Sequence, residues 1–212
     1  MKEIKFYKVN GPYGFFSNFS PHLIFIEGEI WPTVEHYFQA SKFENADVRN
    51  KIKSLKSPMD ASIKGRDRNV MIRPDWEMIK EEVMLNGLLA KFFQHPNLKT
   101  ELLKTENSVL IEDTPNDRYW GNGGDGSGKN RLGKLLMEVR DKINLLSSNS
   151  EEVLPPWIAF PETDQFDLFW RMGLGEEYLS QWSKYYLNCE NERCTKKSSH
   201  QSVLGRTFMI NN

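Results

Sequence analysis

Residues 31–43 read WPTVEHYFQASKF, and this stretch predicts the helix on which the fold depends. Pro32 ends the extended run before it, and the hydroxyl of Thr33 can cap a helix that begins at Val34. The residues that follow are good helix formers, without glycine or proline. Glu35 falls in the first helical turn, where free N–H groups and the helix dipole favour an anion. We therefore expect Glu35 to be ionised.

Strand and helix patterns lie on both sides of this helix. Short apolar or alternating runs predict strands at residues 4–9, 23–29 and 107–113. Helical spacing of apolar residues predicts further helices at residues 76–93, 97–105 and 131–146. The stretch NGPYGFFSNFSP at 10–21, between the first two strands, is rich in turn residues.

The composition excludes several classes of protein. Lys and Arg number 28 against 29 Asp and Glu, so no overall positive field draws the chain to nucleic acid or to a membrane. Long apolar runs are absent, and the first residues lack the apolar segment of a signal peptide. We expect a soluble, cytoplasmic protein. Cys189 and Cys194, with only His200 nearby, fall short of four zinc ligands, so we expect no metal.

A polar break followed by two prolines, SSNSEEVLPP at 147–156, is the best domain boundary in the chain. It predicts one domain at 1–148 and a C-terminal extension at 149–212. The extension is rich in aromatic residues, which argues against disorder. It is small for an independent core, so we expect helices that pack on the main domain, and a mobile stretch of about twenty residues at the end. The sequence does not indicate its role.

A glycine-rich stretch, DRYWGNGGDGSGKNRLGK at 117–134, raises the question of a phosphate loop. The glycine and lysine positions of that motif fit from Gly123 to Lys129, but Asn130 stands where a Ser or Thr should meet Mg²⁺. The residues before it are not a buried apolar strand either. A nucleotide triphosphatase is therefore disfavoured. The glycines allow close contact with another ligand, beside the flat ring of Trp120, or they form a plain surface turn.

Two charged features each have a functional and a structural interpretation. The stretch IKGRDRNVMIRPDW at 63–76 places Lys64 and Arg66 on either side of a glycine, which suits a phosphate group. A solvated charged face is the alternative. Glu35 is either a catalytic carboxylate or a charge that only complements the helix dipole.

Four separated motifs together resemble the YbiA-like, or NADAR, family. They are GFFSNF at 14–19, WPTVEHYFQASKF at 31–43, KGR at 64–66 with DW at 75–76, and DRYWGNGGDGSGKNRLGKLLMEVR at 117–140. The resemblance spans residues 4–146. It implies a single compact α+β domain, mainly helical, that hydrolyses N-glycosidic bonds. Members of this kind release the base from ribose 5-phosphate in early riboflavin intermediates, and related ones remove ADP-ribose from guanine bases.

The resemblance also implies roles for individual residues. Breaking a ribosyl C–N bond passes through a cationic state that needs a nearby negative charge and a positioned water. Glu35 and Asp117 are the candidate catalytic carboxylates, with the roles of acid and base left open between them. The candidate substrate-binding residues are Phe16, Asn18, Phe19, Lys64, Arg66, Trp76, Trp120, Gly121 and Asn122. Lys64 and Arg66 would hold the phosphate, and the glycine loop would close over the ribose.

The expected partner is a small ribosyl-phosphate or ADP-ribosyl molecule, with nucleic acid involved only if it carries an ADP-ribosylated base. No cofactor is required. Two other classes stay open: a module that binds ADP-ribosyl or NAD-derived ligands without turnover, and an interaction protein that works through its aromatic extension. The sequence does not fix the physiological substrate or the oligomeric state.

Overall fold

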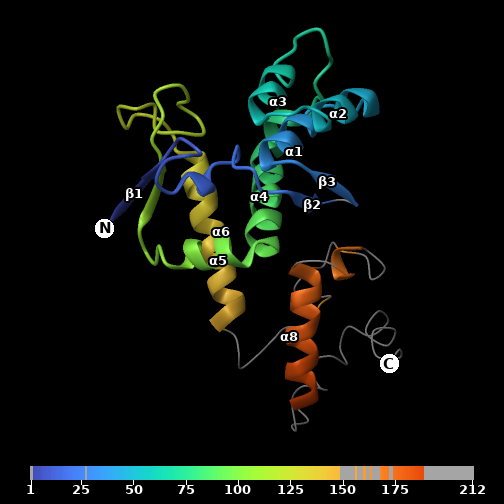
Figure 1. The fold of residues 1–212 in the computed structure, drawn as a ribbon, viewed down its shortest axis with the longest axis vertical. Helices are drawn as coiled ribbons and strands as arrows, with labels where there is room; N and C mark the ends of the chain where they lie inside the picture. The colour runs from blue at the N-terminus through green and yellow to red at the C-terminus, as the bar shows by residue number, and fades with distance from the viewer. Residues whose placement is uncertain are drawn as a thin grey trace. The chain divides into compact units, whose positions relative to one another are not determined.

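The computed structural model describes residues 2–26, 28–148, 156, 160, 163, 168–171 and 174–188 (Figure 1). Backbone contacts divide the chain into two units, Met1–Ile143 and Asn144–Asn212. The elements of the first unit are β1 (Glu3–Phe6), η1 (Gly14–Phe16), β2 (Ile24–Ile26), β3 (Glu29–Trp31), α1 (Val34–Ala40), α2 (Ala46–Lys53), α3 (Pro58–Lys64), α4 (Trp76–Gln94), α5 (Pro96–Leu103), β4 (Val109–Glu112) and most of α6 (Arg131–Ser148), whose last turn belongs to the second unit. The predicted α+β class with mainly helical content is confirmed.

The strands form two small sheets. β1 and β4 pair in parallel although most of the domain separates them in sequence, and this pairing sets Phe6 opposite Glu112. β2 and β3 form an antiparallel hairpin in which Ile24 lies opposite Trp31. The strand expected at 23–29 is confirmed over Ile24–Ile26 but is shorter than predicted, because Gly28 turns the chain with φ of 76°, a conformation that suits glycine.

Side-chain caps explain where the first helices begin. Thr33 Oγ1 accepts a hydrogen bond from the His36 N–H at 3.3 Å, which confirms the predicted start of α1. Asn45 caps α2 and Ser57 caps α3 in the same way, although the sequence analysis predicted neither helix. The predicted bounds of α4, α5 and α6 agree with the structure to within two residues at each end.

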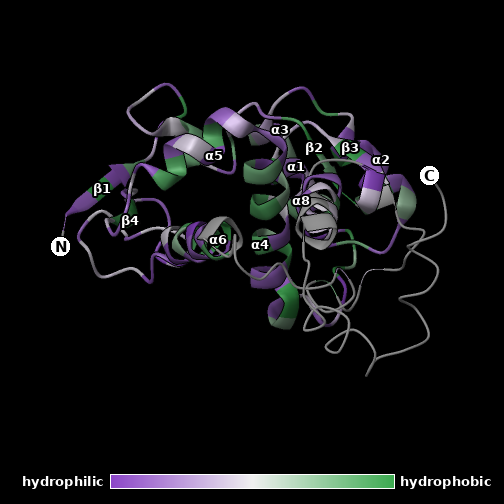
Figure 2. Ribbon diagram, turned by 90° about the horizontal axis from the view of Figure 1, so that it is seen from below, coloured by the Kyte–Doolittle hydropathy of each residue, from purple (hydrophilic) through white to green (hydrophobic). Residues whose placement is uncertain are grey.

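The core forms where α1 packs on α2, α3 and α4 (Figure 1). Figure 2 shows green, hydrophobic stretches along α4 and α5. The largest buried side chains near this core are aromatic: Phe16, Trp31, Tyr37, Phe43 and Phe92. Burial of such rings is the main favourable contribution to folding of a domain this size. It also holds α1, and therefore Glu35, at a fixed position.

Lys91 of α4 is a fully buried cation that holds the turn-rich loop of residues 15–20. Its Nζ donates hydrogen bonds to the carbonyl oxygens of Phe15 and Ser17 and to Ser20 Oγ. Burial lowers the pKa of Lys91. The three acceptors oppose that shift, because only the ammonium form has three N–H groups to donate. Lys91 thus fixes a loop that has little regular structure of its own.

The second unit contains η2 (Leu168–Arg171) and α8 (Leu174–Asn188). Its described aromatic rings contact one another: the centroid of Phe160 lies 5.0 Å from that of Phe169 and 4.9 Å from that of Tyr178. The predictions for Cys189, Cys194 and His200, and for a mobile C-terminal stretch, lie outside the described residues. None of the described helices combines the length and apolar character needed to span a bilayer.

Replacing Lys91 by Met should lower the free energy of unfolding by about 2 to 3 kcal/mol, because the buried oxygens around Nζ would lose their donor. Urea denaturation measures the loss. Lys104→Met is the matched control: Lys104 is largely exposed in an ion pair with Glu101, and its replacement should change stability by no more than about 0.5 kcal/mol. Equal effects of the two substitutions would contradict the anchoring role of Lys91.

Candidate active site

A cavity of about 730 Å³ opens between the first loops of the chain, α1, the start of α4, and the segment from β4 to Trp120. Its volume lies in the range of small-molecule sites. Seven of the residues chosen from the sequence line it: Asn18, Phe19, Glu35, Arg66, Trp76, Asp117 and Trp120. The structure therefore brings together Glu35 and Trp120, which are far apart in sequence.

Glu35 and Asn18 hold each other through two hydrogen bonds. The backbone N–H of Glu35 donates to the carbonyl oxygen of Asn18 at 3.0 Å. The side-chain amide of Asn18 donates in return to Glu35 Oε2 at 2.5 Å. One of the free N–H groups at the start of α1 is thus satisfied by the loop, and the loop amide orients the carboxylate. Asn18 serves Glu35 directly, a role that the sequence analysis did not foresee.

The other oxygen of the Glu35 carboxylate accepts a hydrogen bond from a residue of α1 itself. Gln39, one turn later, donates from Nε2 to Glu35 Oε1 at 2.7 Å. Gly65 allows this arrangement, because a Cβ at that position would lie 1.9 Å from Gln39 Oε1. Ser62 also hydrogen-bonds Glu35, and Arg66 Nη2 donates to Ser62 Oγ at 3.2 Å. Both oxygens of Glu35 thus have fixed donors.

The expectation that Glu35 is simply ionised is corrected. The side chain is only 3% exposed, and burial raises its pKa to about 7. The hydrogen bonds from Gln39 and Ser62 and the charges of Lys42 and Arg66 favour the ionised form, yet they do not offset the loss of water. The dipole argument omitted this burial. Burial thus brings the titration of Glu35 into the neutral range.

The cations at the cavity differ from those expected. Arg66 lines it, but Lys64 does not: Lys64 Nζ lies 2.8 Å from Asp67 Oδ2 in a partly exposed ion pair. Lys42 takes its place. Lys42 Nζ donates to the carbonyl oxygen of Gly65 at 3.2 Å, and burial lowers its pKa while the charge of Glu35 opposes the shift. The structure therefore places Lys42 and Arg66, and not Lys64, among the residues that line the cavity.

Aromatic rings form one wall. The centroid of the Phe38 ring lies 5.0 Å from that of Trp76 and 5.4 Å from that of Trp120. Phe19 also lines the cavity, whereas Phe16 does not. Phe16 is fully buried against Phe6 and Phe92, so the structure places it in the core rather than at the cavity.

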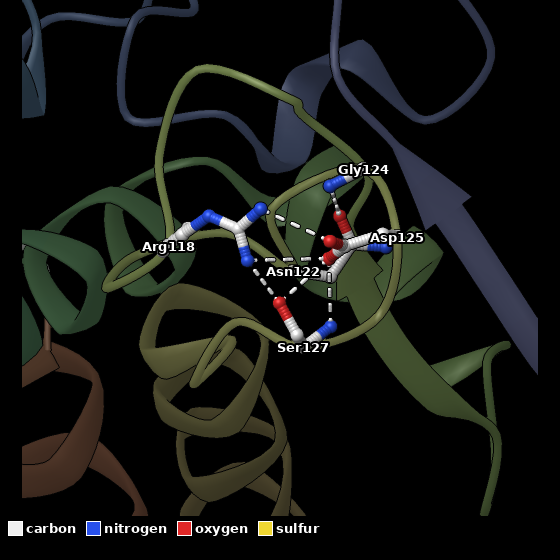
Figure 3. Close-up of polar contacts among 5 residues, drawn as sticks. All are labelled: Arg118, Asn122, Gly124, Asp125 and Ser127. Atoms are coloured by element: carbon white, nitrogen blue, oxygen red, sulfur yellow. Dashed lines mark hydrogen bonds and ion pairs between the residues drawn. The ribbon is translucent and has the colours of Figure 1, made fainter.

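The glycine loop does not offer its backbone to the cavity. Gly121 and Asn122, which were expected to contact the substrate, are buried and are not among the residues that line the cavity. Asn122 donates from Nδ2 to Asp113 and accepts from the Gly124 N–H. In the tip of the loop, Arg118 points toward Asp125 and Ser127 (Figure 3). The N–H groups from residue 122 to 124 and from 127 to 130 donate within the protein, so the loop is not a phosphate cradle.

Asp117 lies where the loop enters the cavity. Its Oδ1 accepts hydrogen bonds from the N–H groups of Tyr119 and Trp120, both at 2.7 Å. This turn directs Tyr119 and Trp120 toward the cavity, and all three residues line it. Asp117 is thus a loop-shaping residue as well as a lining carboxylate.

The sequence analysis missed Glu112, a further acidic side chain at the cavity. Burial, and after it the negative charges of Asp117 and Glu35, together raise its pKa to about 7. Its position at the end of a predicted strand was the available signal, because polar residues at strand ends often face a site. Among the described residues, no group of three or more His, Cys, Asp or Glu side chains could hold a metal.

Comparison with known proteins shows the family to which this chain belongs. The family model described as the NADAR domain matches residues 5–144. N-glycosidase YbiA of Escherichia coli is 51% identical over 140 residues, which cover 66% of this chain and 88% of that protein. The NMR structure of E. coli YbiA superposes with a TM-score of 0.65 at 49% identity, covering 69% of this chain and 87% of that one.

A third relative is the riboflavin biosynthesis protein VVA0006 of Vibrio vulnificus, which is 38% identical over 184 residues. The match covers 84% of this chain and 49% of that protein. Residues 1–148 alone are too few for such coverage, so the match extends into the C-terminal segment.

Replacing Gly65 by Ala should raise the pKa of Glu35 further, because the new Cβ would displace Gln39 and remove a donor to the carboxylate. We expect a rise of about one pH unit, the effect of losing one hydrogen bond to a charged group. Carbon-13 NMR of the glutamate carboxyls, assigned by comparison with Glu35→Gln, measures it. In a Gln39→Ala background the same Gly65 substitution should change the pKa little. Independent, additive effects of the two substitutions would contradict the coupling of Gly65 to Glu35 through Gln39.

Proposed function

We propose a substrate and a set of residue roles for this chain, starting from the facts that it belongs to the NADAR family and is an N-glycosidase. The enzyme hydrolyses the bond between a ribose carbon and the nitrogen of a base. One observation carries the assignment of roles: Glu35 is a buried carboxylate with both oxygens held by donors, at a cavity that also has an aromatic wall and cations.

Glu35 is the group that faces the ribosyl cation. Cleavage of the C–N bond leaves positive charge on C1′ and the ring oxygen, and a carboxylate fixed in a water-poor site stabilises that charge without having to reorganise. The amide donors of Asn18 and Gln39 keep the oxygens in place and favour the ionised form. Asp117 acts from the loop by directing Trp120, and its outer oxygen can bind a ribose hydroxyl.

The aromatic wall binds the base. Trp76, Trp120 and Phe38 offer ring faces and edges to a flat heterocycle, and Phe19 lies at the same cavity. Stacking of a base on an aromatic side chain contributes about 1 to 3 kcal/mol. A base held there leaves with its ring already shielded from water.

Arg66 and Lys42 hold the phosphate. Both line the cavity, and their charges also act on Glu35. Arg66 can bind a phosphate with two parallel N–H groups, while Lys42 acts as a compact point charge. Binding energy from this remote group positions the ribosyl carbon at Glu35.

The substrate class is an early riboflavin intermediate in which a base is joined to ribose 5-phosphate. The V. vulnificus relative, named a riboflavin biosynthesis protein, supports this choice. An ADP-ribosylated guanine base is the competing candidate, since it also presents a base, a ribose and phosphate. We further propose that residues 1–148 form the catalytic domain, that residues 149–212 are auxiliary to it, and that the enzyme acts in the cytoplasm.

Arg66→Ala should lower kcat/KM for the ribose 5-phosphate substrate by about ten- to a hundredfold, the effect of losing a charge-assisted hydrogen bond to phosphate. The dephosphorylated substrate should lose far less. Chromatographic detection of released base from both forms gives the comparison. Lys64→Ala is the matched control, because Lys64 pairs with Asp67 away from the cavity, and it should leave both rates within about twofold. Equal losses with both substrates would assign Arg66 to the support of Glu35 through Ser62.

A further inference from the structure

Glu112 has a fixed backbone and a side chain at the cavity. It is the last residue of β4, paired in register with Phe6 of β1. Its N–H donates to Asn130 Oδ1 at 3.0 Å, and its carbonyl oxygen accepts from the N–H groups of Asn122 and Thr114. The backbone is thus held from both the parallel strand and the glycine loop. The side chain enters the cavity from the sheet, whereas Glu35 enters it from a helix.

The buried Glu35 and the half-buried Glu112 differ in their hydrogen bonds. Glu35 accepts on Oε1 from Gln39 and on Oε2 from Asn18. Glu112 Oε2 is buried and has no hydrogen-bond partner among the described residues. An N–H donor stabilises the ionised form of a carboxyl, and a buried oxygen without a donor favours the protonated form. When one proton is shared between the two acids, it therefore resides on Glu112.

The charges around Glu112 also favour its protonated form. Asp117 from the loop and Glu35 from α1 each make ionisation of Glu112 less favourable, and burial has the largest effect on its pKa. The cations that line the cavity are Lys8, Lys42, Arg66 and Lys80, and Glu77 is the remaining acid. Within the described part of the chain, no ion pair joins any of these cations to Glu112.

We propose that Glu112 is the catalytic acid that protonates the departing base, while Glu35 is the anionic group at the ribosyl carbon. The inference rests on the proposed function, and it supplies the division between acid and base that the sequence left open. Asp117 is in this scheme a positioning residue, since its Oδ1 serves the turn that carries Tyr119 and Trp120.

The reaction balances with one water. The C1′–N bond breaks, its electron pair goes to the base nitrogen, and that nitrogen takes the proton from Glu112. Water then attacks C1′, and the proton that it loses goes to Glu35. Ribose with a free anomeric hydroxyl and the neutral base are the products. Glu112 is now ionised and Glu35 protonated, and proton exchange with solvent restores the starting forms.

The direct test measures kcat against pH for the wild type, Glu112→Gln and Glu101→Gln, with the base–ribose 5-phosphate intermediate as substrate. In the wild type kcat should pass through a maximum near pH 7 and fall on the alkaline side, because Glu35 must be ionised and Glu112 must carry a proton. Glu112→Gln should lower kcat at pH 6 by about a hundredfold or more and abolish the fall at alkaline pH, with little change in KM. Glu101→Gln, at an exposed site on α5, should match the wild type.

A second measurement needs no substrate. Carbon-13 NMR of the carboxyls, assigned by comparison with Glu112→Gln, should show that Glu112 stays protonated at pH 6. An ordinary pKa near 4.5 for Glu112 would overturn the inference, as would a Glu112→Gln enzyme that keeps its rate within threefold and its alkaline fall. Either result leaves the proposed function intact if the wild type releases base. If the wild type releases base from neither the phosphorylated nor the ADP-ribosylated substrate, the proposed function fails, and Glu112 is not its acid.

Discussion

The reciprocal hydrogen bonds between Asn18 and Glu35 connect the fold to the site. The loop carbonyl satisfies a free N–H at the start of α1, and the loop amide fixes the carboxylate that this helix carries. The loop can do this because Lys91 of α4 holds three of its oxygens. The path therefore runs from a buried cation in the core, through an irregular loop, to the carboxylate at the cavity. Removing the Lys91 amine would release the loop, and releasing the loop would leave the Glu35 carboxylate without its Asn18 donor.

Burial at this cavity produces two acids that are alike in pKa but unlike in surroundings. Loss of water raises the pKa of both Glu35 and Glu112 to about 7. Fixed amide donors favour the ionised form of Glu35. The carboxyl oxygen of Glu112 that lacks a hydrogen-bond donor favours the protonated form of that residue. Hydrolysis of an N-glycosidic bond needs one negative charge and one proton in the same pocket. Different hydrogen bonds on the two carboxyls can supply both without a metal-bound water.

Local signals in the sequence predicted much of the fold and part of the site. Thr33 as a cap and the apolar spacing of the later helices were sufficient for α1, α4, α5 and α6. Asn45 and Ser57 are equally good caps, but the sequence analysis did not consider them, so α2 and α3 were missed. Phe16 and Lys64 were misplaced because ring burial and the pairing of Lys64 with Asp67 depend on tertiary contacts. Glu112 ends a predicted strand, which is a local signal, but the parallel pairing of that strand with β1 depends on residues about a hundred positions away and could not be predicted.

The most direct test of the account is the turnover of Glu35→Gln beside a measurement of its stability. We predict that kcat for base release falls by about a hundredfold or more, because a fixed charge next to the ribosyl cation is lost. The unfolding midpoint should be unchanged or higher, since a neutral amide replaces a carboxyl that is costly to bury, and the Gln39 amide can turn to pair with it. An enzyme that keeps its activity within a few-fold of the wild type would contradict the account, because Glu35 would then serve only the helix dipole.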